Sequence, residues 1–276
     1  MKRLLFLAAL ASFALNSCVD VVRLDVPEAA PQLAVDGQIT DQPIPAAVRL
    51  SLTQAYFNGQ APPAVRGAVV LLADDLGRTD TLRETAPGQY RGRGTVRGRV
   101  GGRYSLNINA NGQTYRADTE IRRTPPIDSI GLEFKPGQTG FEEGWYGLYY
   151  GPELPGVGDF YRFKAFKNGV LYNKPDDLIA RSDELVDGRY LNGIELNLEP
   201  LTTGDQFKVE LQSIPRDYFF FLNEMTQQIN NVGLFATSPA NVRTNVRNTR
   251  LGAGAAAAAV GYFAGYTVRT DSVVVR

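Results

Sequence analysis

The feature that most constrains the fold is an alternation of apolar and polar residues, with a period of two, that starts at Leu33. It appears in LAVDGQIT (33–40), VRLSL (48–52) and YSLNI (104–108), with turn signals such as NG at 111–112 between the runs. Successive side chains of a strand point to opposite faces, so this pattern predicts strands with one buried face. Residues 33–124 are therefore expected to form an immunoglobulin-like or transthyretin-like β-sandwich.

A second β-rich region, residues 125–276, begins at the paired prolines Pro125 and Pro126, which cannot occupy a central strand. Aromatic runs at 145–150 (WYGLYY) and 160–166 (FYRFKAF) predict strands within it. We interpret the prolines as a linker. The expected fold class is mainly β, with the N-terminal sandwich followed by a second β-rich domain that carries one α-helix.

That helix is expected near residues 215–230. Its apolar residues recur at spacings of three and four, at Tyr218, Phe219, Leu222, Met225 and Ile229. Ser213 is the expected N-cap, Pro215 suits the first turn and Gly233 follows the end. An apolar stripe of this kind predicts packing on a sheet.

The N-terminus resembles a bacterial lipoprotein signal. Residues 1–3 (MKR) are positive, residues 4–15 are almost entirely apolar, and the sole cysteine, Cys18, follows in the sequence LNSC. The apolar run is shorter than the about 20 residues of a transmembrane helix and suits a signal peptide. We predict that residues 1–17 are removed, that Cys18 carries fatty acyl chains, and that residues 18–32 tether the protein to a membrane. A plain signal peptide with an unrelated cysteine, or a cytosolic start, is the alternative.

The composition removes several classes of function. Lys and Arg together number 29, as do Asp and Glu, so no net basic field favours nucleic acid. The chain has no His, which excludes Ser-His-Asp and Cys-His catalysis as well as His-ligated zinc and haem. With a single cysteine there is no internal disulfide and no cysteine-rich metal site. We therefore expect no enzymatic activity, no cofactor, no metal and no nucleic-acid partner.

Nine segments in order resemble one known family. They include VRGAVVLLADDLG, PPIDSI, GDFYRFKAF, DGRYLNG and VGYFAGYTV, and with the remaining segments they cover nearly the whole chain. The chain is similar to the domain-of-unknown-function family DUF4249, lipoproteins of Gram-negative bacteria that are often encoded beside TonB-dependent receptors. The resemblance implies an outer-membrane location, on the periplasmic face or the cell surface, and a β-barrel receptor as partner. The family has no established enzymatic activity that the resemblance could assign to this chain.

Aromatic residues of the second region are candidates for ligand binding. Those selected are Trp145, Tyr146, Tyr149, Tyr150 and Tyr161. Because they alternate along strands, some face a core, and core packing is the competing interpretation. Exposed members could stack on a sugar or clamp a peptide. The ligand, whether small molecule, peptide or glycan, is not identified by the sequence.

An arginine-rich run gives a second candidate surface. Arg91 and Arg93, then Arg97 and Arg99, are spaced by two, which in a strand places each pair on one face. The surface could dock acidic lipid headgroups or an acidic loop of a partner, or form a solvated edge strand.

Acidic residues offer two weaker alternatives. A calcium site could draw on Asp176, Asp177, Asp183, Glu184 and Asp187, although no EF-hand spacing is present. Glu142 and Glu143 beside Trp145 allow a glycosidase, but adjacent positions do not demonstrate the required separation of two carboxylates. The function expected is thus a lipid-anchored, non-enzymatic accessory of a TonB-dependent receptor in ligand capture. A structural or adhesive surface module is the alternative, and an undetected hydrolase is a further one.

Overall fold

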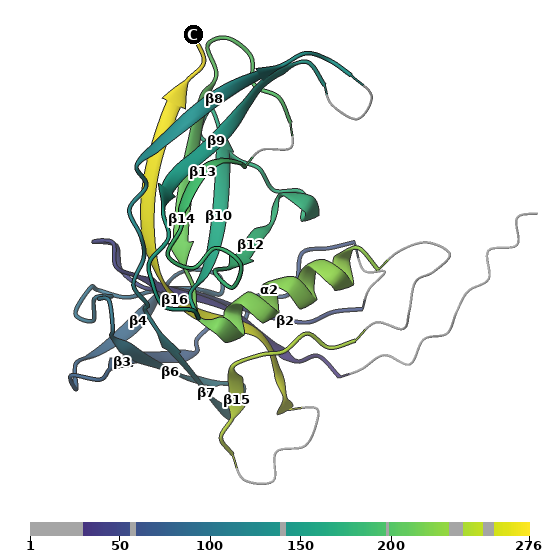
Figure 1. The fold of residues 1–276 in the computed structure, drawn as a ribbon. Coiled ribbons are helices and arrows are strands. Elements are labelled where there is room, and N and C mark those ends of the chain that lie inside the picture. The colour runs from purple at the N-terminus through teal and green to yellow at the C-terminus, as the bar shows by residue number, and fades with distance from the viewer. Residues whose placement is uncertain (1–29, 56–58, 139–141, 197–198, 232–239, 251–256) are drawn as a thin grey trace, which may run out of the picture. The chain divides into compact units, whose positions relative to one another are not determined.

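The strands of the computed structural model form one large, continuous sheet and one small sheet (Figure 1). The structure describes residues 30–55, 59–138, 142–196, 199–231, 240–250 and 257–276. Within these residues the protein is mainly β with one α-helix of 14 residues, as the sequence predicts.

The N-terminal strands build a layered core. They are β1 (Leu33–Thr40), β2 (Ala47–Leu52), β3 (Val69–Asp74), β4 (Thr79–Ala86), β5 (Gln89–Arg91), β6 (Arg103–Ala110) and β7 (Gln113–Glu120). Alternate residues such as Leu50, Leu72 and Leu106 are fully buried. The apolar positions of the period-two pattern therefore lie on the buried face of the strands, as predicted. The order β2-β5-β4-β3-β6-β7 is antiparallel throughout.

Two C-terminal strands complete this N-terminal core. Strand β15 (Val246–Asn248) pairs with β7, and the first half of β16 (Ala259–Val274) pairs in parallel with β1. Phe263 of β16 is fully buried in the same apolar cluster as Leu50. Pro125 and Pro126 therefore do not separate two self-contained sheets, because the chain returns across this point to fill the first core.

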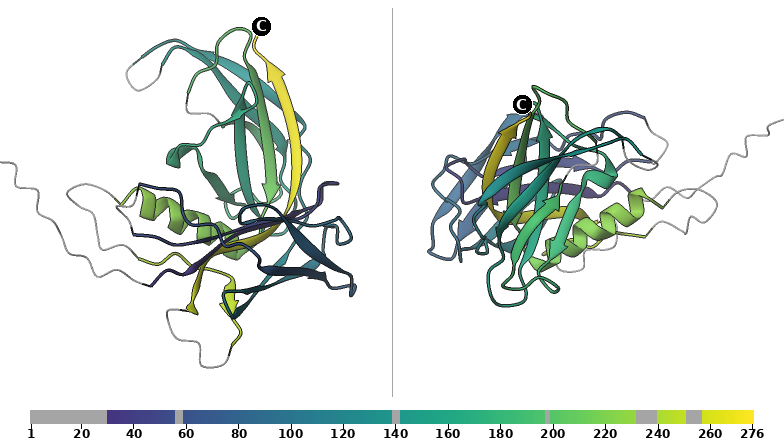
Figure 2. Two further views of the ribbon diagram at one scale, coloured as in Figure 1. Left: turned by 180° about the vertical axis from the view of Figure 1, so that it is seen from behind. Right: turned by 45° about the horizontal axis from the view of Figure 1, so that its top comes forward.

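The remaining strands pack as two layers. Strands β10 (Phe160–Lys167), β11 (Val170–Leu171), β12 (Ile179–Ser182) and β14 (Gln206–Ser213) extend the large sheet from the second half of β16. The small sheet contains β8 (Ser129–Lys135), β9 (Gly144–Pro152) and β13 (Tyr190–Glu195). Phe207 and Val209 of β14 lie in the apolar cluster that also holds Tyr149 of the small sheet. Figures 1 and 2 show β16, in yellow, running from the β1 region up alongside β14.

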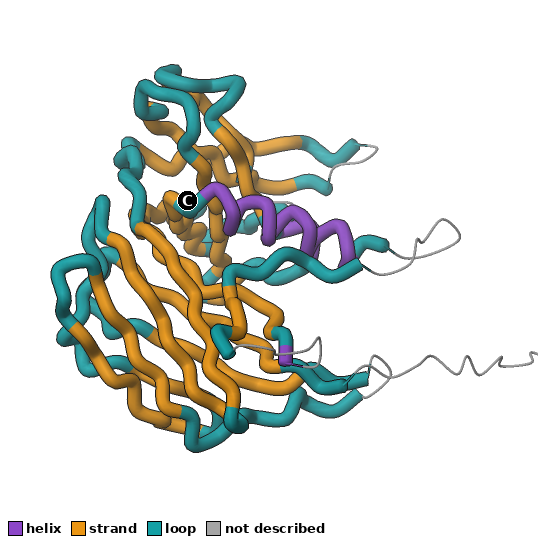
Figure 3. Tube along the Cα trace, turned by 90° about the horizontal axis from the view of Figure 1, so that it is seen from below, coloured by secondary structure: helices purple, strands orange, loops and turns teal. Residues whose placement is uncertain are grey.

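The helix α2 (Arg216–Ile229) covers the other face of the large sheet, beside the strand layers in Figure 3. Leu222 packs with Tyr262 and Tyr266 of β16 in a separate apolar cluster. The predicted helix is confirmed, but the predicted cap is wrong. Pro215 is the N-cap residue, because β14 extends through Ser213 and buries it.

A 3-10 turn, η1 (Pro175–Asp177), precedes β12 and lies against α2. No helix in the described ranges is long and apolar enough to cross a membrane.

Candidate functional site

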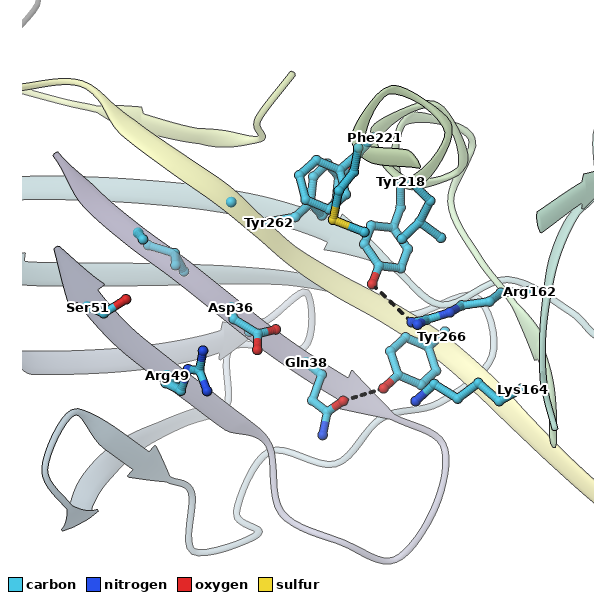
Figure 4. Close-up of a pocket in the computed structure, with 16 residues that line it drawn as sticks. Asp36, Gln38, Arg49, Ser51, Arg162, Lys164, Tyr218, Phe221, Tyr262 and Tyr266 are labelled. Atoms are coloured by element: carbon cyan, nitrogen blue, oxygen red, sulfur yellow. Dashed lines mark hydrogen bonds between the residues drawn. The ribbon is translucent and has the colours of Figure 1, made fainter. Parts of the chain in front are cut away.

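A groove of about 470 Å³ lies between α2 and the outer face of the large sheet, and we call it the α2 groove (Figure 4). Its polar lining comes from β1, β2 and β10 of the sheet: Asp36, Gln38, Arg49, Ser51, Arg162 and Lys164. Its apolar and aromatic lining comes mainly from α2 and β16: Tyr218, Phe221, Leu222, Met225, Tyr262 and Tyr266. Pockets of this volume suit small organic ligands or part of a larger one.

The alternation of strand residues explains this lining. On β10, Tyr161 and Phe163 enter the core shared with the small sheet, so Arg162 and Lys164 point to the opposite face. On β16, Phe263 enters the N-terminal core, which places its even-numbered neighbours beneath α2. The groove thus lies on the face of the large sheet that is opposite the two apolar cores.

Two cations, Arg162 and Lys164, lie side by side in the groove, and both side chains extend over β16 toward Tyr266 (Figure 4). Both are partly buried. Arg162 Nη1 donates a long hydrogen bond of 3.5 Å to the Tyr218 hydroxyl, and neither cation forms a salt bridge within the described ranges. Burial, followed by repulsion from Arg162, lowers the pKa of Lys164. Two like charges held together without a counterion favour a bound anion.

Two carboxylates lie near this pair, but neither forms a salt bridge with it within the described ranges. Glu210 is the cross-strand neighbour of Lys164, but the side chain of Gln212 donates to its Oε1. Asp36 is exposed on β1. Both carboxylates favour the charged form of Lys164 electrostatically, and its pKa is lowered nevertheless.

Aromatic packing fixes the helix side of the groove. The ring centroids of Tyr218 and Tyr262 are 4.9 Å apart, and those of Phe221 and Tyr262 are 5.2 Å apart. The hydroxyl of Tyr266 donates to the side chain of Gln38, and burial raises the pKa of Tyr266, so the hydroxyl stays protonated. The wall is therefore a rigid, neutral surface next to the cations.

A larger recess of about 670 Å³ offers an internal comparison. It is also rich in arginine, but Arg116 lies 2.9 Å from Asp118 and Arg122 lies 3.1 Å from Glu120. These two arginines already have carboxylate partners, whereas Arg103 and Arg216 of the same recess form no salt bridge within the described ranges. The α2 groove differs from this recess because its half-buried cations, Arg162 and Lys164, form no salt bridge within the described ranges.

The sequence-predicted aromatic group is largely core, which corrects its interpretation as a binding surface. Tyr146, Tyr149 and Tyr161 are 2%, 1% and 5% exposed. Burial raises the pKa of Tyr149 to about 12. Trp145 and Tyr150 are partly exposed, and Trp145 packs edge-on against Phe134 at 5.4 Å. For Tyr149 and Tyr161 the physical reason is that β9 and β10 face each other across the core between the two sheets. Tyr146 lies outside that cluster, and its hydroxyl donates to the carbonyl oxygen of Glu142.

The predicted arginine pairs do not share a strand face either. Arg91 ends β5, whereas Arg93, Arg97 and Arg99 lie in an irregular loop. The carboxylate of Asp80 accepts the backbone N–H groups of residues 93, 94 and 95 and so turns the chain away from the sheet. Arg99 also forms a salt bridge with Asp75.

The acidic residues considered for calcium divide into two groups. Asp183 and Asp187 approach Glu153, with carboxylate oxygens within 4.8 Å of one another. Backbone N–H groups already occupy them: Gly158 donates to Asp183, Gly156 to Asp187 and Gly188 to Glu153. These bonds indicate a role in holding loops together. The remaining residues considered, Asp176, Asp177 and Glu184, do not belong to this group. Cys18 lies outside the described residues.

Sequence reasoning missed the α2 groove. The available signal was the pair Arg162 and Lys164 at alternate positions of the aromatic run FYRFKAF, which places two cations on one face. Finding Arg49 and Asp36 nearby requires the pairing of β1 with β2 and β16, which no local pattern gives.

The comparison with family models identifies the family. The model described as "Domain of unknown function (DUF4249)" matches residues 19–272, so the chain belongs to this family. This confirms the resemblance read from the sequence. No curated protein sequence matches the chain.

Proposed function

We propose that this protein is a lipid-anchored, non-enzymatic binding protein of the cell envelope that holds a ligand in the α2 groove for a TonB-dependent receptor. The observation that carries the binding role is the half-buried pair Arg162 and Lys164, which lacks a carboxylate partner within the described ranges. Cations without a carboxylate partner attract an anionic ligand into the groove.

The lining supports binding rather than chemistry. Catalysis by acid and base requires two groups in hydrogen-bond reach with matched pKa values. In the α2 groove the two cationic groups repel each other, and the hydroxyl of Tyr266 is engaged by Gln38. Ser51 and Asp36 are not hydrogen-bonded to each other in the structure.

The membrane part of the proposal comes from the sequence. Acyl chains on Cys18 would hold the body near a membrane, because two or more chains give stable anchoring. An outer-membrane location and a β-barrel receptor as partner accord with the lipobox-like sequence and with what is expected of the family.

Purification of the mature lipoprotein from membranes in mild detergent tests this role. We expect a TonB-dependent β-barrel to co-purify in a fixed ratio, measured by mass spectrometry and by the mass of the complex. The Cys18→Ser variant, expressed at the same level, serves as the control that separates envelope anchoring from receptor contact. If the lipoprotein purifies alone, even after cross-linking in intact cells, the accessory role is refuted.

A further inference from the structure

We infer that the ligand of the α2 groove is an acidic oligosaccharide, held through its carboxylate or sulfate groups by a row of basic side chains that begins at Arg162 and Lys164. This inference rests on the proposed binding role and adds the chemical class of the ligand. Two observations support it: four basic side chains on the outer face of the large sheet are spread over several strands, and they form no salt bridges within the described ranges.

The basic groups continue beyond the groove. An adjoining recess of about 270 Å³ shares Asp36, Gln38 and Arg49 with the α2 groove and adds Arg91. Like Arg162 and Lys164, the exposed Arg49 and Arg91 form no salt bridge in the part of the chain that the structure describes. The basic groups therefore follow one connected path over the sheet. We call these four residues the cationic path.

The length of this path favours an oligomer over a single anion. From β10 to β5 the sheet order is β10-β14-β16-β1-β2-β5. Neighbouring strands lie about 4.8 Å apart, so Arg91 on β5 and Arg162 on β10 are separated by several strand spacings. Charges distributed over this distance match repeated acidic groups along an extended ligand better than one carboxylate.

Hydrogen-bonding groups between the cations favour a sugar. Asp36 and Gln38 lie between Arg49 and the pair on β10, and Ser51 follows Arg49 on β2; all three offer oxygen acceptors or donors suited to hydroxyl groups. Tyr218 and Phe221 add partly exposed rings on the helix side. The carboxylate of Asp36 can accept hydrogen bonds from the hydroxyls of a sugar, which oligogalacturonate offers and oligoglutamate does not.

The backbone of the floor disfavours an extended peptide. Peptides that bind sheets commonly add a strand to a free edge. Here β1 is paired on both sides, with β2 and β16, and β14 is paired on both sides, with β10 and β16. The main-chain groups of Leu33–Gln38 and Phe207–Ser213 are therefore engaged within the sheet, and recognition on this face depends on side chains.

Calorimetric titration of the mature chain tests the inference with defined probes: oligogalacturonate, a neutral glucose oligomer of the same length, oligoglutamate and inorganic phosphate. We expect oligogalacturonate to bind and its affinity to fall as salt rises. Replacing Arg162 and Lys164 together with Gln should weaken binding about tenfold or more, the scale of a lost charge-assisted hydrogen bond. Lys164→Arg should retain binding because it keeps the charge.

Arg116→Gln is the matched control, because that arginine is paired with Asp118 in the other recess and should leave the affinity unchanged. Circular dichroism melting confirms that each variant is folded. Tighter binding of oligoglutamate, equal binding of the neutral oligomer, or equal competition by phosphate would each overturn the inference. If no probe binds while the receptor still co-purifies, the ligand class is wrong and the accessory role stands. If oligogalacturonate binds and no receptor co-purifies, the ligand class is right and the accessory role is refuted.

Discussion

At the scale of single residues, Asp205 shows how a buried carboxylate organises the entry into β14. Thr202 N donates to it at 2.8 Å, Asn168 Nδ2 at 2.7 Å, and Lys167 Nζ lies 2.9 Å away. The backbone hydrogen bond from Thr202, followed by Lys167, lowers the pKa of Asp205. These bonds therefore stabilise the fold while the carboxylate is ionised.

We predict that Asp205→Asn lowers the free energy of unfolding at pH 7 by about 1–3 kcal/mol, the range for hydrogen bonds to a charged group. Because the folded-state pKa is below the unfolded value of 3.8, this stability is present above that value and is lost as the pH falls through the folded pKa. Urea unfolding at pH 7 and in acid should thus show a difference that shrinks with acidity. Glu184→Gln on an exposed loop is the control, and a difference independent of pH would contradict the account.

Lys164 is predicted to act in the opposite sense. Its folded-state pKa is lowered below 10.5, so the unfolded chain binds more protons between the two values, and stability rises with pH through that window. Lys164→Met should therefore raise the free energy of unfolding at pH 7, and this gain should diminish as the pH approaches 10.5. Chemical unfolding of both proteins from pH 7 to 10.5 measures it. A loss of stability at pH 7 would show that Lys164 is paired inside the fold.

At the scale of elements, the pairing of β1 with β16 depends on a close backbone approach at Gly261. This residue has φ +88°, and a Cβ there would lie 2.0 Å from the carbonyl oxygen of Val35. Only glycine adopts this conformation without strain and leaves room for the neighbouring strand.

Gly261→Ala should lower the free energy of unfolding by about 2 kcal/mol or more, from backbone strain and steric overlap together. Gly77→Ala is the matched control, because Gly77 has φ +78° but nothing within 4 Å of its Cβ position. Thermal melting of both variants separates strain from overlap. Equal losses in the two variants would show that the contact with Val35 contributes nothing.

Local patterns predict elements here but not their partners. The spacing of three and four places the helix at 215–230, close to the observed Arg216–Ile229, because amphipathic spacing is a local property. The spacing of the arginine run predicts a strand. In the structure, backbone N–H groups of this run donate to the carboxylate of Asp80, on another strand, and the run forms a loop. The aromatic run is compatible with either an exposed or a buried face. Alternation along a strand does not show which of its two faces a second sheet covers.

At the scale of the whole molecule, the two regions on either side of Pro125 and Pro126 are joined by β16. Its first half completes the N-terminal sheet through eight paired positions with β1, and its second half pairs with β14. The sequence predicts a separate sandwich at 33–124, whereas these contacts leave such a fragment without Phe263 in its core.

We therefore predict that residues 31–124 alone give a broad, weakly cooperative melt by circular dichroism. Deletion of one buried aromatic residue costs about 3–5 kcal/mol, a large part of the stability of a small domain. Addition of a peptide of residues 240–276, which carries β15 and β16, should sharpen the transition. A cooperative melt of the fragment alone would show that the first region folds without the returning strands.

The proposed membrane attachment concerns Cys18, the sole cysteine of the chain. In the proposed lipid-anchored form, attachment rests on acyl chains at this one residue. Cys18→Ser should move the protein from the membrane pellet to the soluble fraction, measured by fractionation after a high-salt wash. Because salt weakens attraction between the cationic path and acidic lipids, the wash distinguishes electrostatic adhesion from acylation. A variant that stays in the pellet after the wash would show that the protein is held by something other than lipid on Cys18.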